Sequence, residues 1–546
     1  MNLKDIKSQF PIFKSNKNLI YFDTANSAQK PIQVIDALED FYKNHYANIG
    51  RAVYGLAARA TANYDNTRET IKEFVNGSDG EIIFTKNSTE SLNLVAHCFG
   101  KFLKEGDEII LTEAEHHSNY VPWHFLRKKK VNIKFIPINE EGEVQVDQLT
   151  SLITNKTKMI SIIHVSNVTG LTTNVKKVIS IARAKKIPVC IDGTQAVTHS
   201  HVDLKELDCD FYAFSAHKIY GPTGVGILFM KNKWVEQFEP FNGGGGMIQN
   251  VDTKNITYAS GVSKFEAGSL ASAEVIALKH AIKFVKDIKI KNIVSHEQSL
   301  ATYALDKISK FNDIEFVGRP SDKGSVFSFN IKGVHAHDAS TVFDEDDIAV
   351  RAGHHCCQIL HKKMKIGSSL RVSFGVYNNK QDIDALCDKI MDLTELYQDL
   401  ILDHGKKPRN FGKCNKFNHD AEGHNPLCGD NIHVYLILDK DKKVTDISFE
   451  GSGCAISVAS SSIMTEIVKG RSEKQARELL NSFFKMIKEG QEIKKAGLTE
   501  DEHIKFSSLA GVGKFPMRVK CATLSWHTLK AALDNEKKPI NSEIID

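Results

Sequence analysis

Short hydrophobic strands alternate regularly with amphipathic segments between residues 80 and 230, and this pattern constrains the fold most. The strands are almost continuously hydrophobic, so both faces of the sheet that they form must be covered by helices. The pattern predicts an α/β fold with a mostly parallel sheet. The predicted strands span residues 81–84, 108–111, 133–138, 158–165, 187–192, 211–214 and 226–230.

The remaining chain is too long to belong to the same hydrophobic core. A chain of 546 residues exceeds the roughly 250 to 300 residues at which one core stops growing, so two or three cores are expected. Residues 251–395 mix two predicted helices with three predicted strands, as a separate α+β lobe would. The helices are expected at 271–285 and 296–311, and the strands at 326–330, 348–351 and 370–374.

A second domain is predicted after residue 395. Nearly unbroken helix is expected over residues 381–403, followed by a loop rich in turn residues over residues 404–412. A small α+β domain is then expected, with a hairpin and three helices. Its strands are predicted at 432–438 and 444–450, and its helices at 457–468, 473–489 and 522–532.

Composition excludes several classes of protein. A net charge of +4 is small for this length, and no basic stripe indicates nucleic-acid binding. The longest apolar runs are too short to cross a membrane. The N-terminus lacks the features of a secretory signal, so we expect a cytoplasmic protein. Ten cysteines are too sparse for a disulfide scaffold and are better interpreted as core residues, nucleophiles or metal ligands.

Three polar groups at strand ends fit the needs of pyridoxal phosphate. This cofactor requires a lysine for its aldehyde, an acid facing its ring nitrogen and a phosphate cup at a helix N-terminus. Lys218 follows the strand at 211–214, and Asp192 ends the strand at 187–192. Residues 87–90 open a helix after the first strand, and His116 could stack on the ring. Lys218 alone would be interpreted as a surface lysine, but the combination favours the cofactor.

The first 395 residues resemble the group II, SufS-like cysteine desulfurases. The resemblance implies the fold type I architecture of pyridoxal-phosphate-dependent transferases, with a large domain over about residues 20–250 and a small lobe from the N-terminus and residues 251–395. It also implies a homodimer. The matching stretches are residues 21–23, 88–96, 115–117, 164–168, 192–197, 215–218, 265–268 and 351–356.

This resemblance also implies a role for each site residue. Lys218 would bind the cofactor aldehyde, Asp192 would pair with the ring nitrogen, and His116 would stack on the ring as a catalytic residue beside Lys218 and Cys356. Asn167 and Gln195 would lie near the phenolic oxygen. The phosphate would be held by Ser88, Thr89, Ser215, His217 and, from the neighbouring subunit, Ser269. The substrate would be bound by Arg371, Asn167 and Arg351.

Cys356 is the predicted nucleophile. Four contiguous residues at 354–357 cannot all turn toward one metal ion, and the polar loop favours an exposed thiolate over a buried structural thiol. Cysteine would displace Lys218 from the cofactor, the ring would act as an electron sink, and the Cys356 thiolate would attack the substrate sulfur. Two departures from the family stand out: Cys357 occupies a position that is commonly small, and Gly50 replaces a histidine.

Cysteines at element ends of the second domain could converge on a metal ion. Cys428, Cys454 and Cys521, with Asp430, could form a tetrahedral site, although their spacing alone is not diagnostic. Residues 397–535 resemble the SufU branch of the U-type iron-sulfur scaffold family. That resemblance implies zinc bound by these four residues, with Cys428 as the sulfur acceptor.

The sequence therefore predicts a fusion of a cysteine desulfurase with a sulfur acceptor for iron-sulfur cluster assembly. L-cysteine is the expected substrate and downstream assembly proteins are the expected partners. A selenocysteine lyase is the alternative enzyme, and an iron-sulfur assembly scaffold is the alternative role for the whole chain. A further hypothesis is that His337 replaces Cys428 on zinc, which frees the acceptor thiol; a loop histidine with no such role is the simpler alternative.

Overall fold

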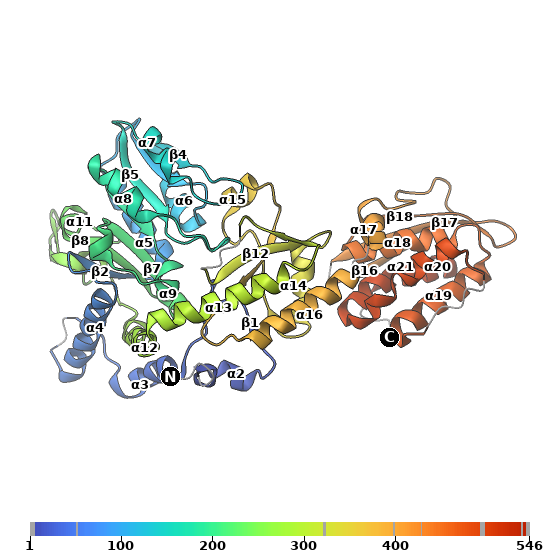
Figure 1. Cartoon of the computed structure of the whole chain (residues 1–546), viewed down its shortest axis with the longest axis horizontal. Helices are drawn as coiled ribbons and strands as arrows, with labels where there is room; N and C mark the ends of the chain where they lie inside the picture. The colour runs from blue at the N-terminus through green and yellow to red at the C-terminus, as the bar shows by residue number, and fades with distance from the viewer. Residues whose placement is uncertain are drawn as a thin grey trace. The chain divides into compact units, whose positions relative to one another are not determined.

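The computed structural model describes residues 6–50, 53–319, 324–396, 399–426, 429–491, 497–536 and 539–541. The chain divides into two compact units (Figure 1). Unit 1 comprises Met1–Asn330 and Asp346–Ala385, and unit 2 comprises Ile331–Glu345 and Leu386–Asp546. Unit 2 therefore includes a short segment that lies within the first domain in sequence. Among the helices of the described residues, none is long and apolar enough to span a membrane.

Unit 1 is built on a seven-stranded sheet with the order β2-β8-β7-β6-β5-β3-β4. Strand β8 is antiparallel to both of its neighbours, and the other pairings are parallel. This confirms the prediction of a mostly parallel sheet. The strands are β2 (Gly80–Thr85), β3 (Glu108–Thr112), β4 (Asn132–Ile136), β5 (Thr157–Ile163), β6 (Val189–Asp192), β7 (Phe211–Ser215) and β8 (Gly226–Lys231).

Hydrophobic side chains of successive strand residues belong to two separate cores, as a sheet covered on both faces requires. Ile82 belongs to one core and Ile83 to the other. The first core includes helices α3 (Ile32–Asp40), α4 (Gly55–Phe74), α8 (Val175–Ala184) and α12 (Ser272–Ile288). The second includes α5 (Ser88–Gly100), α6 (His117–His124) and α11 (Asn232–Gln237).

A smaller four-stranded sheet, ordered β11-β12-β15-β14, completes unit 1. The strand predicted at 348–351 is divided, because β13 (Ile348–Ala349) pairs with β1 (Ile20–Tyr21) whereas β14 (Arg351–Gly353) pairs with β15 (Ser369–Ser373). The other strands of unit 1 are β9 (Ile248–Val251), β10 (Ile256–Tyr258), β11 (Ile314–Phe316) and β12 (Val326–Ile331). The other helices include α2 (Ile12–Ser15), α7 (Leu149–Leu152), α9 (Ala196–His199), α10 (Leu204–Leu207), α13 (Ile290–Ile308) and α15 (Gln358–Lys363).

Unit 2 contains a sheet with the order β18-β17-β16-β19, on which helices α18 and α21 pack. Strand β17 is antiparallel to both β16 and β18. The strands are β16 (His419–Asn425), β17 (Asp430–Leu438), β18 (Val444–Ser452) and β19 (Ile540–Asn541). The helices are α14 (Ala336–Asp344), α17 (Asp399–Lys406), α18 (Ala455–Val468), α19 (Glu473–Glu489), α20 (Glu500–Ser507) and α21 (Pro516–Asp534), while α16 (Lys380–Leu396) spans the boundary between the units.

Three predictions for the second domain were wrong. The loop expected from His404 begins later, because α17 continues to Lys406 while the buried His404 ring bonds the Ser462 hydroxyl through Nδ1 at 2.8 Å. Strand β16 was missed because its sequence, HDAEGHN, has almost no hydrophobic residues to mark alternation. Helix α20 was missed as well, although Thr499 and Glu502 form a capping box at its start.

Candidate functional site

A cavity of about 280 Å³ lies at the carboxyl ends of the parallel strands of unit 1. Open α/β sheets bind ligands at this edge, and a volume near the lower end of the roughly 300 to 1,000 Å³ typical of ligand pockets suits a small organic molecule. The cavity is lined by Asn26, Asn87, Ser88, Thr89, His116, Ser118, Ile163, Val165, Asn167, Asp192, Thr194, Gln195, Ser215, His217, Lys218 and Cys356.

Lys218 ends a single 3-10 turn, Ala216–Lys218, directly after β7. Burial lowers the pKa of its amine to about 8, and the positive charge of Arg371 acts in the same direction. The backbone carbonyl of Lys218 accepts a hydrogen bond from the Thr198 hydroxyl at 3.0 Å, which fixes the turn. The amine is therefore held in the cavity and is much closer to its neutral, nucleophilic form than an exposed lysine.

Asp192 is a buried carboxyl group at the end of β6. It accepts hydrogen bonds from the backbone amide and hydroxyl of Thr194. Burial raises the pKa of Asp192, while these hydrogen bonds and the charge of Lys218 lower it. A buried carboxylate needs a cationic neighbour, so this position fits the protonated ring nitrogen of pyridoxal phosphate.

The N-terminus of α5 also lines the cavity, through Asn87, Ser88 and Thr89. The Asn87 side chain caps the helix by accepting from the Glu90 amide at 2.9 Å. The Ser215 hydroxyl accepts from the Ser88 amide at 2.8 Å and lies 3.0 Å from the Ser88 hydroxyl. Gly226 permits this approach, because a Cβ there would lie 2.3 Å from the Asn87 carbonyl carbon. Helix amides and hydroxyls in this arrangement suit a phosphate group.

The ring of His116 is suited to stacking rather than to proton transfer at neutral pH. His116 precedes α6, and its Nδ1 accepts from the Ser118 amide at 3.1 Å. Burial, together with the positive charge of Lys218, lowers the pKa of His116 to about 3. The ring is therefore neutral across the physiological range, and it lines the cavity.

Asn167 and Gln195 line the cavity while their amides bond the backbone. The Asn167 amide nitrogen donates to the His355 carbonyl at 2.7 Å, and that of Gln195 donates to the Ala25 carbonyl at 2.7 Å. His217, another lining residue, bonds the Ser27 hydroxyl through Nδ1 at 3.2 Å. These contacts fix the side chains in place before any ligand arrives.

Three predicted residues are not among those that line the cavity: Arg351, Arg371 and Ser269. Ser269 is exposed, as a residue that serves a neighbouring subunit would be. Arg351 and Arg371 are direct partners in the β14–β15 register. The buried Arg371 guanidinium donates to the Asp23 carboxylate at 2.9 Å and to the Asn167 carbonyl at 3.2 Å. Among the described residues, its Nε has no hydrogen-bond partner.

The two adjacent cysteines occupy different environments. Cys356 is half-buried and lines the cavity, whereas Cys357 is fully buried, with its Sγ 3.0 Å from the Asn167 amide oxygen. Burial raises the pKa of the Cys357 thiol far above its ordinary value. Within the described part of the chain, residues 354–357 form no metal-binding group. Cys356 is therefore the accessible thiol of the pair.

Sequence reasoning missed some of the supporting residues. Thr194, which donates to Asp192, could have been found from its place two residues beyond the strand-ending carboxylate. Asp23 belongs to one of the stretches that match the family, but its contact with Arg371, 348 residues away in sequence, was not indicated by any local pattern. Asn26 and Ser118 also line the cavity, and neither was signalled by a motif.

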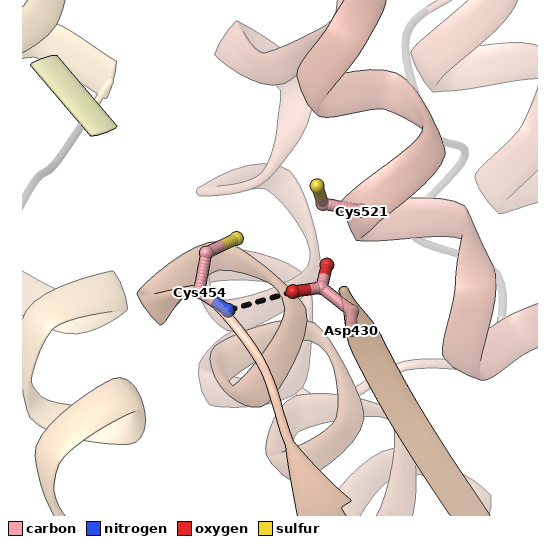
Figure 2. A group of neighbouring side chains, drawn as sticks. All are labelled: Asp430, Cys454 and Cys521. Atoms are coloured by element: carbon pink, nitrogen blue, oxygen red, sulfur yellow. Dashed lines mark hydrogen bonds between the residues drawn. The ribbon is translucent and has the colours of Figure 1, made fainter. Parts of the chain in front are cut away.

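A second candidate site lies in unit 2. Asp430 begins β17, Cys454 precedes α18, and Cys521 lies in the second turn of α21. One ligand atom from each lies within 4.8 Å of the others. Figure 2 shows the three side chains as neighbours, and the Cys454 amide donates to the Asp430 carboxylate at 2.9 Å. Cys428, the fourth predicted ligand, lies outside the described residues.

The donor set of this cluster fits a zinc ion. The second carboxylate oxygen of Asp430 is buried and, among the described residues, has no hydrogen-bond partner. A buried, unpaired carboxylate oxygen is costly unless a cation binds it. The Asn425 amide donates to the Cys521 sulfur at 3.7 Å, as an outer residue supporting a thiolate ligand would. Two sulfurs and one carboxylate are typical zinc donors.

Two protein families match the chain. Aminotransferase class-V matches residues 20–386, and the NifU-like N-terminal domain matches residues 396–522. A probable cysteine desulfurase of Staphylococcus aureus strain COL is 42% identical over 403 residues, covering 72% of this chain and 98% of the relative.

Similar solved structures cover the same part of the chain. The cysteine desulfurase CsdA of Escherichia coli, in its S-sulfonic acid form, shares 36% identity with a TM-score of 0.68, and the alignment covers 72% of this chain and 99% of CsdA. The apo cysteine desulfurase of Thermococcus onnurineus NA1 shares 32% identity with a TM-score of 0.69, covering 72% of this chain and 98% of that structure.

Proposed function

The chain belongs to the class-V aminotransferase family and carries a NifU-like domain, and from this premise we propose that it is a pyridoxal-phosphate-dependent cysteine desulfurase that feeds iron-sulfur cluster assembly. The observation that carries the proposal is that Cys356 and Lys218 line one cavity together with the acid, the phosphate cradle and the stacking ring. Pyridoxal phosphate, when bound, withdraws electrons from the bonds around the substrate's α-carbon.

The chain's own residues supply the rest of the chemistry. Arg371 would bind the substrate carboxylate, for which its guanidinium is suited, although it lies outside the cavity lining and would have to exchange its bond to Asp23 for the substrate. The Cys356 thiolate attacks the sulfur of L-cysteine. A sulfur–sulfur bond forms, the substrate's carbon–sulfur bond breaks with its electron pair on carbon, and protonation of that carbon gives alanine. The sulfur remains on Cys356 as a persulfide.

The test is the reaction itself. Full-length protein supplied with pyridoxal phosphate should convert L-cysteine to equal amounts of alanine and transferable sulfur, measured by amino-acid analysis and by sulfide release with a reductant. L-selenocysteine, tested at the same concentration, addresses the alternative of a selenocysteine lyase. Turnover of selenocysteine with no alanine from cysteine would overturn the proposal.

The lowered pKa of Lys218 predicts how cofactor uptake depends on pH. The amine must be neutral to bond the cofactor aldehyde. It is protonated below its pKa of about 8 and neutral above it, so the uptake rate of apo protein should rise with pH and level off above about pH 8. An ordinary lysine, with a pKa of about 10.4, would give a rate that keeps rising to about pH 10. Stopped-flow absorbance measures the rate, and a continued tenfold rise per pH unit above 8.5 would contradict the assignment.

The second domain is proposed to be a zinc-binding sulfur acceptor. Asp430, Cys454 and Cys521, with Cys428, would bind the ion, and the Cys428 thiol would receive sulfur from Cys356. The mixed sulfur and carboxylate donors favour this role over that of a cluster scaffold. Metal analysis separates the two: about one zinc per chain supports a sulfur acceptor, whereas an iron-rich, brown protein supports a scaffold.

Cys454→Ser is expected to weaken zinc binding at least about 100-fold, because an alcohol is a far poorer ligand than a thiolate. Zinc content after dialysis against a competing chelator measures the loss. The matched control is Cys414→Ser, a buried cysteine of unit 2 outside the cluster, which bonds Asp446 and the Asn415 backbone instead. Equal zinc content in the two variants would refute the assignment of this cluster.

His337 is proposed as the ligand that replaces Cys428 on zinc during transfer. It belongs to unit 2 and is exposed at the start of α14. The carbonyl of the next residue, Asp338, accepts from Arg518 at 3.0 Å, and Arg518 lies one helical turn before Cys521. This contact supports a place for His337 near the cluster. The replacement hypothesis requires that His337→Ala keep alanine production while losing transfer to Cys428.

Three further properties complete the proposal. The chain forms a homodimer in which Ser269 reaches the cofactor phosphate of the partner subunit, which the exposure of Ser269 supports. It works in the cytoplasm, because the described cysteines are all free. It delivers sulfur to downstream iron-sulfur assembly proteins.

A further inference from the structure

The loop that carries the nucleophile has an unusual backbone. His355 and Cys356 both adopt left-handed conformations, with φ values of +50° and +57°. Such conformations cost free energy in any residue with a Cβ, and two in succession persist only where surrounding contacts impose them. The bonds that hold this loop therefore determine where the Cys356 thiol points.

Hydrogen bonds to consecutive carbonyls provide that restraint. The His354 carbonyl accepts from the Cys357 amide at 2.8 Å, and the Cys356 carbonyl accepts from the His117 amide at 2.8 Å. Between them, the His355 carbonyl accepts from the side-chain nitrogen of Asn167 at 2.7 Å. Asn167 thus holds the backbone of the loop at its first left-handed residue, while the His355 ring bonds Ser369.

The orientation of the Asn167 amide follows from its neighbours. A carbonyl can only accept, so the amide nitrogen must face the His355 carbonyl and the amide oxygen must face the other way. That oxygen lies 3.0 Å from the Cys357 sulfur. An oxygen acceptor there requires the thiol to donate, so Cys357 is a neutral hydrogen-bond donor. Its sulfur is fully buried and makes this contact on the side of the loop away from solvent.

We propose that Cys357 is a positioning residue for the desulfurase reaction. Its thiol donates a hydrogen bond that fixes the orientation of the Asn167 amide. The amide in turn donates to the His355 carbonyl, and this bond holds the loop so that Cys356 lies in the cavity. The proposal rests on the proposed function, since it assigns Cys357 to the same reaction. It also explains why a second thiol next to the nucleophile does not compete with it. The Cys357 thiol is buried and hydrogen-bonded to Asn167, so it is not accessible to the persulfide.

The test compares Cys357→Ala with Cys357→Ser. Alanine removes the donor, whereas serine restores one. One lost hydrogen bond corresponds to about a 3- to 10-fold effect on rate. Cys357→Ala is therefore expected to lower kcat for alanine formation about 3- to 10-fold with an unchanged KM for L-cysteine, and Cys357→Ser is expected to recover most of the loss. Cofactor absorbance should be unchanged in both variants.

A second measurement needs no cofactor. Iodoacetamide alkylation of Cys356 in the apo protein, followed by peptide mass spectrometry, reports loop mobility. Cys357→Ala should alkylate faster than wild type because the loop is released, while its kcat falls. A role in packing alone gives no such opposite change. Cys209→Ala, which removes another fully buried thiol, is the matched control and should change neither rate.

The outcomes separate this inference from the proposed function. If wild type forms alanine and Cys357→Ala matches it in kcat and in alkylation rate, the positioning role is refuted. If Cys357→Ser is as slow as Cys357→Ala, packing and not hydrogen bonding explains the loss, and the role is also refuted. If wild type forms no alanine from L-cysteine, the proposed function fails, and the alkylation rates still report on the loop.

Discussion

Cys356→Ser is expected to lower sulfur extraction from L-cysteine at least about 10³-fold, because it removes the nucleophile while leaving the cavity intact. A serine hydroxyl remains protonated at neutral pH and is a far poorer nucleophile than a thiolate. Alanine formation per chain, followed by amino-acid analysis, measures the loss. Cofactor absorbance should stay at the wild-type level, because Lys218 is untouched.

The matched control for this variant lies one residue along the chain. Cys357→Ser makes the same chemical change in the buried thiol, and its expected effect is within about 3-fold of wild type. A second comparison uses L-cysteine with labelled sulfur. The label bound to the peptide that contains position 356 should be lost only in Cys356→Ser. Persistent alanine formation by that variant would mean that another group accepts the sulfur.

Lys218→Ala is expected to abolish covalent attachment of the cofactor and to lower turnover at least about 10³-fold. The Lys218 amine lies in the cavity, and loss of a positioned amine removes both the covalent anchor and a proton carrier. After borohydride reduction, peptide mass spectrometry should find the cofactor on the Lys218 peptide of wild type and on no peptide of the variant.

Lys231→Met is the control for Lys218→Ala. Lys231 is a largely buried lysine at the end of β8, and it forms ion pairs with Asp79 and Asp208 instead of lining the cavity. Its replacement should reduce stability and leave cofactor attachment unchanged. Attachment of the cofactor to a lysine peptide other than that of Lys218 in wild type would disprove the assignment.

The large sheet could be predicted from sequence because its strands are buried on both faces. Continuous hydrophobic runs such as β7 and β8 admit few other interpretations. Strand β16 was not predicted because it has no such hydrophobic run. Only Ala421, Gly423 and Asn425 point inward along that strand, and none of them is a large hydrophobic residue. A strand without a hydrophobic face becomes visible only through its partners in the sheet.

Local sequence identified the cavity residues that follow a strand but not the contacts that arrange them. Lys218, Asp192 and Ser88 each lie at the end of a strand or the start of a helix, and such places can be predicted from the hydrophobic pattern. The bond from Asn167 to His355 joins residues 188 positions apart. The left-handed backbone of Cys356 depends on such bonds, so its geometry required the folded structure.

Unit 2 contains a segment, Ile331–Glu345, that the chain supplies from within the first domain. Gly333 of that segment lies so close to Leu402 that a Cβ would come within 2.4 Å of it, and Val342 and Phe343 are fully buried. Unit 2 is therefore not formed by the C-terminal part of the chain alone. A chain divided near residue 395 would separate α14 from the rest of unit 2.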